Sequence, residues 1–402
     1  MVTLATAAPV TPVISKRILS IDLLRGAVMI IMALDHVRDY FHDAAFLYDP
    51  TDLSQTSTTL FFTRWITHFC APVFTFLAGA SAYLNGAKKS KKELSMFLFT
   101  RGLWLVLAEV LIITLGWTFN PVYPVLILQV IWAIGFSMMV LSVMIFLPEI
   151  LILITGLVLI FGHNLLDAFH ATGASGGDFV LSALHEQHFF PGQPFSVMLG
   201  YPVIPWIGIM LTGYVFGKMY LPLFDTAKRK KILIWLGLGA IALFITLRYI
   251  DIYGDPRHWA EQKTPVLTLL SFLNTTKYPP SLLYILMTLG PAMLVLAFAE
   301  KPLNRLTEKL VVFGRVPMFY YIVHIYLIHI LAILAAVMSG YKWSDMVLTG
   351  WVSMNAQLRG FGYSLWLVYA LWILLIIALY PLCKWYDNYK RAHRNKWWLS
   401  YI

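Results

Sequence analysis

The chain of 402 residues is 59% hydrophobic and only 12% charged, and it has a formal net charge of +10. This composition excludes an ordinary soluble domain, in which about a quarter of the residues are charged. Apolar runs of about 20 residues, the length that crosses the hydrocarbon core of a bilayer, recur from end to end. The sequence therefore predicts an all-α polytopic membrane protein. Because no soluble basic domain is predicted, the positive charge does not indicate nucleic acid as a partner. The predicted partner is membrane lipid.

Ten apolar segments, bounded by charge clusters or by Pro and Gly, are predicted to form transmembrane helices in one bundle. They are residues 20–41, 62–85, 97–118, 122–147, 149–166, 201–221, 231–250, 280–299, 316–338 and 363–384. Ten spans place both termini on the same side of the membrane. With these boundaries, 22 of the 30 Lys and Arg residues lie on that side. Because Lys and Arg are enriched in cytoplasmic loops, both termini are predicted to be cytoplasmic.

The predicted organisation is a single membrane domain with two short ends. Residues 1–16 form a cytoplasmic N-terminal tail, residues 17–386 form the membrane domain, and residues 387–402 form a basic cytoplasmic C-terminal tail. The connections on the other side of the membrane are longer, and loops of such length are usually functional or disordered.

One of these outer loops contains the tetrapeptide "HEQH" at residues 185–188. It is one residue short of the H-E-x-x-H spacing that places two histidines on one helix face for zinc. A solvated loop that happens to contain histidines is the favoured interpretation, and no metal site is predicted.

The first span, "SIDLLRGAVMIIMALDHVRDYFH", contains Arg25, Asp35 and His36 within an apolar run. A charged side chain at the bilayer centre costs about 3 kcal/mol on insertion scales. With a rise of 1.5 Å per residue, His36 lies about 16 Å deeper in the membrane than Arg25. Asp35 points about 100° away from His36 around the helix. The sequence leaves its partner open between Arg38, His68 and another span.

Other spans also place a polar side chain near the middle of the bilayer. His324 lies about 13 Å deeper than Arg315, and His68 lies about 9 Å below the outer surface. Glu109 and Gln129 come out at a similar depth in the third and fourth spans. Such residues mark a transport path, a proton relay or an active site. The candidate catalytic residues are therefore His36, Asp35, His68 and His324.

Two arginines are candidates for binding an anion at the cytoplasmic side. Arg315 stands at the predicted start of a helix between Gly314 and Pro317, and Arg25 precedes Gly26. A helix N-terminus with exposed amides and a nearby cation is a favourable phosphate site. Each arginine alone is more typical of a positive-inside anchor. Together they indicate a cytoplasmic ligand with phosphate groups whose other end reaches toward a histidine.

The segments "SIDLLRGAVMIIMALDHVRDYF", "PVFTFLAGASAYL", "YPVIPWIGIMLTGYVFGK", "YPPSLLYILMTLGP" and "VVFGRVPMFYYIVHIYLIH" resemble the bacterial members of the heparan-α-glucosaminide N-acetyltransferase catalytic-domain family. The resemblance covers the chain from about residue 17. Arg25 and His36 also match the R-x10-H signature of membrane acyltransferases that modify bacterial O-antigens. The resemblance implies a transmembrane acetyltransferase of the bacterial inner membrane, with acetyl-CoA as donor and a carbohydrate or amino-sugar acceptor beyond the membrane.

In this interpretation, His36 is the reactive histidine, and Arg25 and Arg315 hold the phosphates of coenzyme A. The eukaryotic lysosomal members use a histidine in the first lumenal loop, and His42 is the nearest residue to that position here. The sequence leaves open the roles of His42 and His329, and whether His36 acts as a base or carries the acetyl group. It also leaves open a homodimer, and a transporter with a central histidine proton relay is the alternative function.

Overall fold

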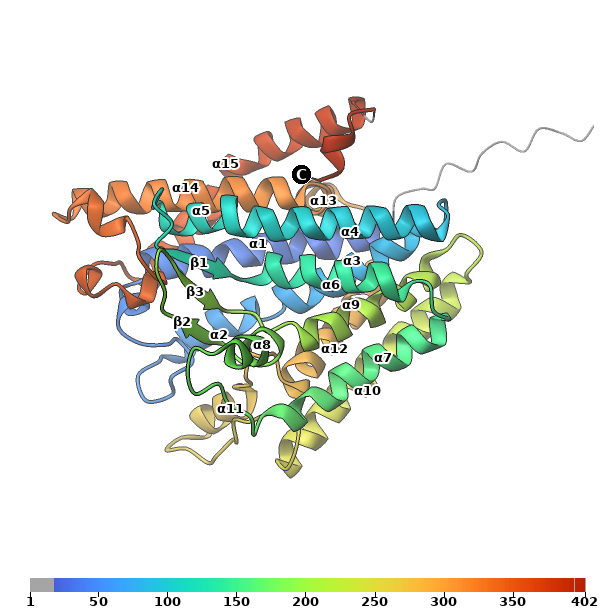
Figure 1. Ribbon diagram of the computed structural model, residues 1–402, viewed down its shortest axis with the longest axis horizontal. Coiled ribbons are helices and arrows are strands. Elements are labelled where there is room, and N and C mark those ends of the chain that lie inside the picture. The colour runs from blue at the N-terminus through green and yellow to red at the C-terminus, as the bar shows by residue number, and fades with distance from the viewer. Residues whose placement is uncertain (1–17, 394, 402) are drawn as a thin grey trace, which may run out of the picture.

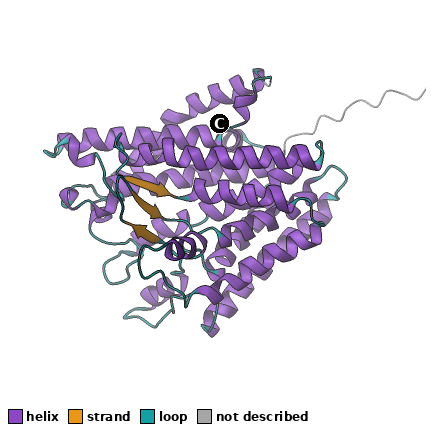
Figure 2. Cartoon of the chain, in the orientation of Figure 1, coloured by secondary structure: helices purple, strands orange, loops and turns teal. Residues whose placement is uncertain are grey.

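The computed structural model describes residues 18–393 and 395–401, so the predicted tail of residues 1–16 lies outside the described residues. The helices are α1 Leu19–Phe41, α2 Thr58–Thr67, α3 Cys70–Gly86, α4 Lys91–Ala108, α5 Thr114–Thr118, α6 Val130–Met144, α7 Glu149–Gly162, α8 Gly176–Leu184, α9 Ile204–Phe216, α10 Thr226–Ile250, α11 Pro265–Leu273, α12 Leu282–Phe298, α13 Arg305–Arg315, α14 Pro317–Met338 and α15 Leu365–Ala392. The strands are β1 Val125–Leu128, β2 His188–Phe190 and β3 Ser196–Leu199. Helices thus dominate the described chain (Figure 2).

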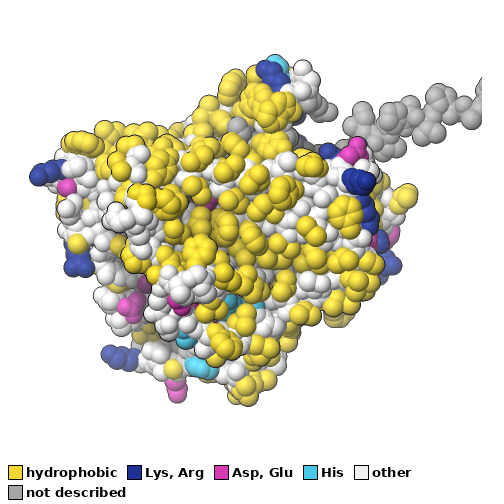
Figure 3. Space-filling model, viewed as in Figure 1, with side chains coloured by type: hydrophobic (Ala, Val, Ile, Leu, Met, Phe, Trp, Pro, Cys, Tyr) yellow, Lys and Arg dark blue, Asp and Glu magenta, His cyan; other side chains and the backbone are white. Residues whose placement is uncertain are grey.

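The long helices lie side by side in one bundle, with α1 inside it (Figure 1). A helix lies within each of the ten predicted segments, and among the described residues six helical segments are long and apolar enough to cross a membrane. Hydrophobic side chains cover the middle of the face seen in Figure 3, as expected for a surface in contact with lipid. The predicted all-α polytopic membrane fold is confirmed.

The two ends of the bundle differ. The end at which α1 begins, which we call the basic end, includes the connection from α3 to α4 with Lys88–Lys92, and the start of α10 with Lys228–Lys231 (Figure 1). The opposite end, which we call the loop end, contains the strands and the longer connections (Figure 1). The orientation predicted from the distribution of Lys and Arg places the basic end in the cytoplasm.

A small sheet at the loop end was not predicted from the sequence. Its strand order is β1-β3-β2, with β1 parallel to β3 and β2 antiparallel to it. Because Val125–Leu128 pair with β3, α6 begins only at Val130, eight residues after the predicted start of the fourth span. The fourth span is therefore part strand and part helix.

Close helix packing places the two predicted arginines near each other. A Cβ atom at Gly26 of α1 would lie 1.9 Å from the Leu310 carbonyl oxygen, and one at Gly314 of α13 would lie 1.9 Å from the Asp22 carbonyl oxygen. Only glycine permits this backbone approach between α1 and α13. The residues beside these glycines, Arg25 and Arg315, are thereby brought to the same region of the basic end.

One detail of the predicted anion site was wrong, and the other agrees with the structure. Arg25 lies inside α1, which already begins at Leu19, so its neighbours in the chain are not a helix N-terminus. Arg315 directly precedes Val316, the N-cap of α14, which begins at Pro317, so it lies at the start of a helix as predicted. It is also the last residue of α13, a short helix that was not predicted from the sequence.

Candidate functional site

His36 of α1 and His324 of α14 form a direct pair in the interior of the bundle. The Nδ1 atom of His36 lies 2.7 Å from Nε2 of His324, and both side chains are buried. On the other side of its ring, Nδ1 of His324 lies 2.8 Å from the carbonyl oxygen of Tyr320. The structure thus brings together two of the three predicted catalytic histidines, although they are 288 residues apart in the chain.

The contacts of this pair fix which nitrogen carries each proton when both rings are neutral. A carbonyl oxygen only accepts hydrogen bonds, so Nδ1 of His324 must donate to Tyr320 and Nε2 of His324 must accept. Nδ1 of His36 therefore donates to His324, and Nε2 of His36 keeps its lone pair. His324 orients His36 in this assignment, which follows from the hydrogen-bond partners.

Aromatic side chains enclose the pair. The His36 ring makes edge contacts with Trp117 and Tyr321, with centroid distances of 4.9 and 5.9 Å. Tyr320 stacks on His324 at 4.9 Å. These contacts limit the rotation of both imidazoles, so His36 keeps one orientation.

Asp35 does not pair with a histidine. Its carboxylate lies 2.8 Å from Nη1 of Arg38 on the next turn of α1 and 2.5 Å from Nη1 of Arg64 of α2. Arg38 also pairs with Asp39 at 2.6 Å. This buried ion cluster of Asp35, Arg38, Asp39 and Arg64 answers the question that the sequence left open. It makes Asp35 a residue that holds α1 against α2.

His68 lies apart from the His36–His324 pair. It caps the C-terminal end of α2, its ring packs against Tyr284 at 5.2 Å, and its backbone carbonyl accepts a hydrogen bond from the Tyr284 hydroxyl. Among the described residues no hydrogen bond or ring contact joins His68 to His36, so a role for His68 in orienting His36 is not supported.

The two other histidines near the pair have separate positions. His42 follows α1 directly, accepts a hydrogen bond from Ala44 N at 3.2 Å and faces the loop end. Both ring nitrogens of His329 lie within 3.0 Å of backbone carbonyl oxygens, those of Gly116 and Met346. These contacts hold α14 against α5 and against the loop that follows α14. They indicate a structural role for His329.

Two cavities enter the bundle from opposite ends. The inner cavity, at the basic end, has a volume of about 1060 Å³, and its wall includes Arg25, Arg101 and Arg315. The outer cavity, at the loop end, has a volume of about 420 Å³, and its wall includes His36 and Trp117. Ligand sites in proteins usually have volumes of about 300–1,000 Å³. Both cavities are therefore large enough for a substrate, and His68 lines neither of them.

The two cavities are lined by neighbouring residues of the same segments. In α1, Met32 lines the inner cavity and His36, one turn further on, lines the outer cavity. Before α6, Gln129 lines the outer cavity and Val130 lines the inner one. The His36–His324 pair thus lies at the place where a ligand entering from the basic end would meet one entering from the loop end.

The predicted arginines line the inner cavity but already have acidic partners. Arg25 donates to the Ser81 hydroxyl at 2.7 Å and pairs with Asp22 at 3.3 Å. Arg315 lies 3.8 Å from Asp22 and 3.4 Å from Asp387. These contacts fix both guanidinium groups at the cavity wall.

Arg101 of α4 is a third arginine in the inner cavity, and it was not predicted from the sequence. Arg25 lines the same cavity, and within the described part of the chain Arg101 forms no ion pair with a carboxylate. The presence of an arginine within the predicted third span could have indicated this residue as a candidate. Only the packing of α4 shows which way it points.

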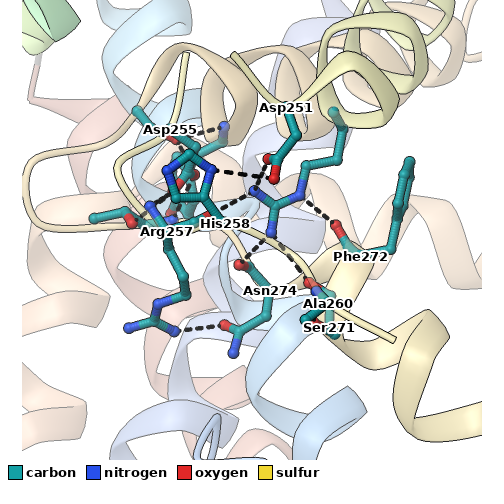
Figure 4. A network of polar contacts seen from close by, with 12 residues as sticks. Asp251, Asp255, Arg257, His258, Ala260, Ser271, Phe272 and Asn274 are labelled. Carbon is teal, nitrogen blue, oxygen red and sulfur yellow. Dashed lines mark hydrogen bonds and ion pairs between the residues drawn. The ribbon is translucent and has the colours of Figure 1, made fainter. Parts of the chain in front are cut away.

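A network of buried polar contacts supports the rim of the outer cavity (Figure 4). The guanidinium group of Arg248 is buried and donates to backbone carbonyls of the segment between α10 and α12, among them those of Phe272 in α11 and of Asn274 after it. Asp255 accepts hydrogen bonds from Thr276 in the same segment. The network fixes the residues that follow, and Lys277 and Tyr278 line the outer cavity.

The histidines of "HEQH" are not part of this site. His185 is 2% exposed, lies 2.8 Å from the carboxylate of Asp167 and packs against His163. The expectation of a solvated loop was therefore wrong for His185, because the loop folds back on the end of α7. Among the described residues there is no group of three side chains with the arrangement of a metal site.

Comparison with known proteins gives one family match. The family model described as heparan-alpha-glucosaminide N-acetyltransferase, catalytic, matches residues 17–250, which is more than half of the chain. The matched region includes α1 with Arg25 and His36, and the helices that supply Arg64 and Arg101. No curated protein matches the chain.

Proposed function

The chain belongs to the heparan-α-glucosaminide N-acetyltransferase catalytic family, a family of membrane acetyltransferases, and we propose that it moves an acetyl group from acetyl-CoA to an acceptor on the other side of the membrane. The donor enters the inner cavity from the cytoplasm. The acceptor, a hydroxyl or amine of a carbohydrate or amino sugar, enters the outer cavity. The membrane is the cytoplasmic membrane of a bacterium. The observation that carries this proposal is the position of His36 in the outer cavity, one turn of α1 from Met32 in the inner cavity.

The charged and apolar residues of the inner cavity support coenzyme A as its ligand. The phosphates of coenzyme A carry negative charge, and Arg25, Arg101 and Arg315 line the cavity near the basic end. Arginine binds phosphate through a planar fork of N–H groups. Further in, the wall is apolar and includes Met29, which suits the pantetheine arm. The acetyl thioester at the end of that arm then reaches the neighbouring residues that line the two cavities.

His36 is the general base of the proposed reaction. Its Nε2 atom accepts the proton of the acceptor hydroxyl or amine, while Nδ1 stays bonded to His324. The acceptor oxygen or nitrogen attacks the carbonyl carbon of the thioester, the C–S bond breaks, and the departing sulfur takes the proton from His36. We favour this direct transfer over an acetyl-histidine intermediate, because it needs only one free nitrogen on one imidazole, and His36 has one.

Arg101 gives the sharpest test of the donor site. Since a hydrogen bond to a charged group contributes about 1.5–3 kcal/mol, replacing Arg101 by Gln is expected to weaken acetyl-CoA binding about 10-fold to 100-fold. The measurement is equilibrium binding of radiolabelled acetyl-CoA to the purified protein. Arg25→Lys and Arg315→Lys are expected to lose less, because lysine keeps the charge but not the fork.

The matched control is Arg305→Gln, which removes an exposed arginine from α13 at the same end, outside the cavity. Its affinity for acetyl-CoA is expected to equal that of the unchanged protein. Equal affinity in the Arg101, Arg25 and Arg315 variants as well would show that these residues are only anchors, and the proposed donor site would be wrong.

A further inference from the structure

Gln129 lies at the junction of β1 and α6 and has no role in the mechanism proposed above. It is the one residue between β1 and α6, and the helix begins directly after it at Val130. Gln129 lines the outer cavity together with His36 and Trp117, whereas Val130 lines the inner cavity. Its side chain therefore lies where donor and acceptor meet in the proposed reaction.

The side-chain amide nitrogen of Gln129 has no hydrogen-bond partner among the described residues. The residue is only 5% exposed, and no acceptor in the described part of the chain lies within reach of its Nε2 atom. Buried polar side chains are nearly always hydrogen-bonded, so each exception calls for an explanation. A buried N–H donor on a cavity wall is explained by a ligand that accepts its hydrogen bond.

The backbone on both sides of Gln129 is held in place. Before it, the backbone N–H of Ile127 donates to the Thr114 hydroxyl at 3.2 Å. After it, the backbone N–H of Trp132 donates to the Glu109 carboxylate at 2.8 Å. Glu109 begins a π-helical segment, Glu109–Ile113, whose wider turn directs this buried carboxylate at the start of α6. The position of Gln129 is thus fixed before any substrate binds.

We propose that Gln129 donates a hydrogen bond to the carbonyl oxygen of the acetyl group during transfer. This inference rests on the proposed function. When the acceptor adds to the carbonyl carbon, the π electrons move to the oxygen, which becomes an oxyanion, and the acceptor proton goes to Nε2 of His36. When the C–S bond breaks, the electrons return to re-form the carbonyl, and the sulfur leaves with that proton. Gln129 stabilises the oxyanion between these two events.

The surroundings favour this role. A donor that is positioned in advance and shielded from water stabilises an oxyanion more than water does, because it needs no reorganisation during the reaction. The N-terminal end of α6, directly after Gln129, adds a partial positive charge. Glu109 acts as a positioning residue, since it holds the start of α6 and does not contact the substrate.

Infrared spectroscopy of bound acetyl-CoA, labelled with ¹³C at the thioester carbonyl, tests this role of Gln129. Hydrogen bonding to the carbonyl oxygen lowers the carbonyl stretching frequency. In the unchanged protein the band is expected below its position in solution. In Gln129→Met, which keeps the length of the side chain and removes the donor, the band is expected to rise to or above the solution position with unchanged acetyl-CoA affinity. The kcat for acetyl transfer to glucosamine, used as the acceptor probe, is expected to fall about 100-fold to 1000-fold.

Further variants separate this role from a structural one. Gln357→Met, an exposed glutamine outside both cavities, is expected to leave the band and the kcat unchanged. Glu109→Gln keeps an acceptor for Trp132 N–H and is expected to keep the lowered band, whereas Glu109→Leu is expected to lose it. Should Gln129→Met not fold, Gln129→Asn, whose amide is withdrawn by one methylene, carries the same expectation of a raised band.

The outcomes distinguish this inference from the proposed function. A lowered band that persists in the Gln129 variant, with acetyl-CoA still bound, overturns the role of Gln129 and leaves the acetyltransferase proposal intact. Failure of the unchanged protein to bind acetyl-CoA overturns the proposed function, and this inference with it.

Discussion

Replacing His36 by alanine is expected to reduce acetyl transfer by about 100-fold to 10,000-fold, the usual contribution of a general base, while acetyl-CoA still binds. The reason is the separation of the two tasks in the structure. The cationic groups that contact coenzyme A in our proposal lie at the basic end, whereas His36 lines the outer cavity, one turn of α1 beyond Met32 of the inner cavity. The rate is measured with radiolabelled acetyl-CoA and glucosamine as the acceptor probe, and the affinity by equilibrium binding.

His324→Ala is expected to lose less activity than His36→Ala, because it removes the residue that orients the base and not the base itself. His170→Ala is the matched control, since this histidine is exposed in an outer loop and its side chain is 68% accessible. A His36→Ala protein that transfers acetyl groups at the original rate would remove His36 from the mechanism. Labelled acetyl bound to His36 in the absence of acceptor would replace direct transfer by the covalent route.

The second large effect is expected at Asp35. This carboxylate lies between Arg38 and Arg64, and all three side chains are largely buried. Removing one partner of a buried ion pair leaves an uncompensated charge and usually costs about 3–5 kcal/mol. Asp35→Asn is therefore expected to lower the free energy of unfolding by about this amount. The thermal unfolding midpoint of the purified protein in detergent measures the loss.

A second substitution tests whether the arginines cause this loss. Asp35→Asn leaves Arg38 its ion pair with Asp39 but takes from Arg64 its partner on α1. In Asp35→Asn combined with Arg64→Gln, the guanidinium group of Arg64 is removed as well, so part of the lost stability is expected to return. Asp43→Asn, at a nearby exposed aspartate, is expected to change the midpoint little. If Asp35→Asn unfolds at the original temperature but loses transfer, Asp35 acts in the chemistry and does not serve to hold α1 against α2.

The membrane spans were predictable from the sequence because the bilayer imposes a simple rule. A helix that crosses it needs about 20 apolar residues, and this length is visible without knowledge of neighbouring helices. The break in the fourth span was not predictable in this way. Residues 122–129 are about as apolar as the predicted transmembrane helices. Part of this stretch has an extended backbone because β1 pairs with β3, which lies about 70 residues later in the chain.

The candidate site was partly predictable for a related reason. His36 and Arg25 are on one helix, so their separation follows from helical geometry alone. The pairing of His36 with His324 depends on how α1 and α14 pack, and depth estimates placed His68 equally well beside them. The partner of Asp35 and the inward direction of Arg101 are also tertiary facts. An apolar pattern does not specify how helices rotate against one another, and that rotation decides these contacts.

The acetyl donor and the acceptor are proposed to reach His36 from opposite ends of the bundle, and membrane vesicles of known orientation test this most directly. Radiolabelled acetyl-CoA is supplied only on the side of the basic end, and glucosamine coupled to dextran, which does not cross the membrane, is supplied only on the other side. We predict labelled acetyl on the dextran-bound glucosamine, and none with His36→Ala. Labelling that requires donor and acceptor on the same side would contradict transfer across the membrane.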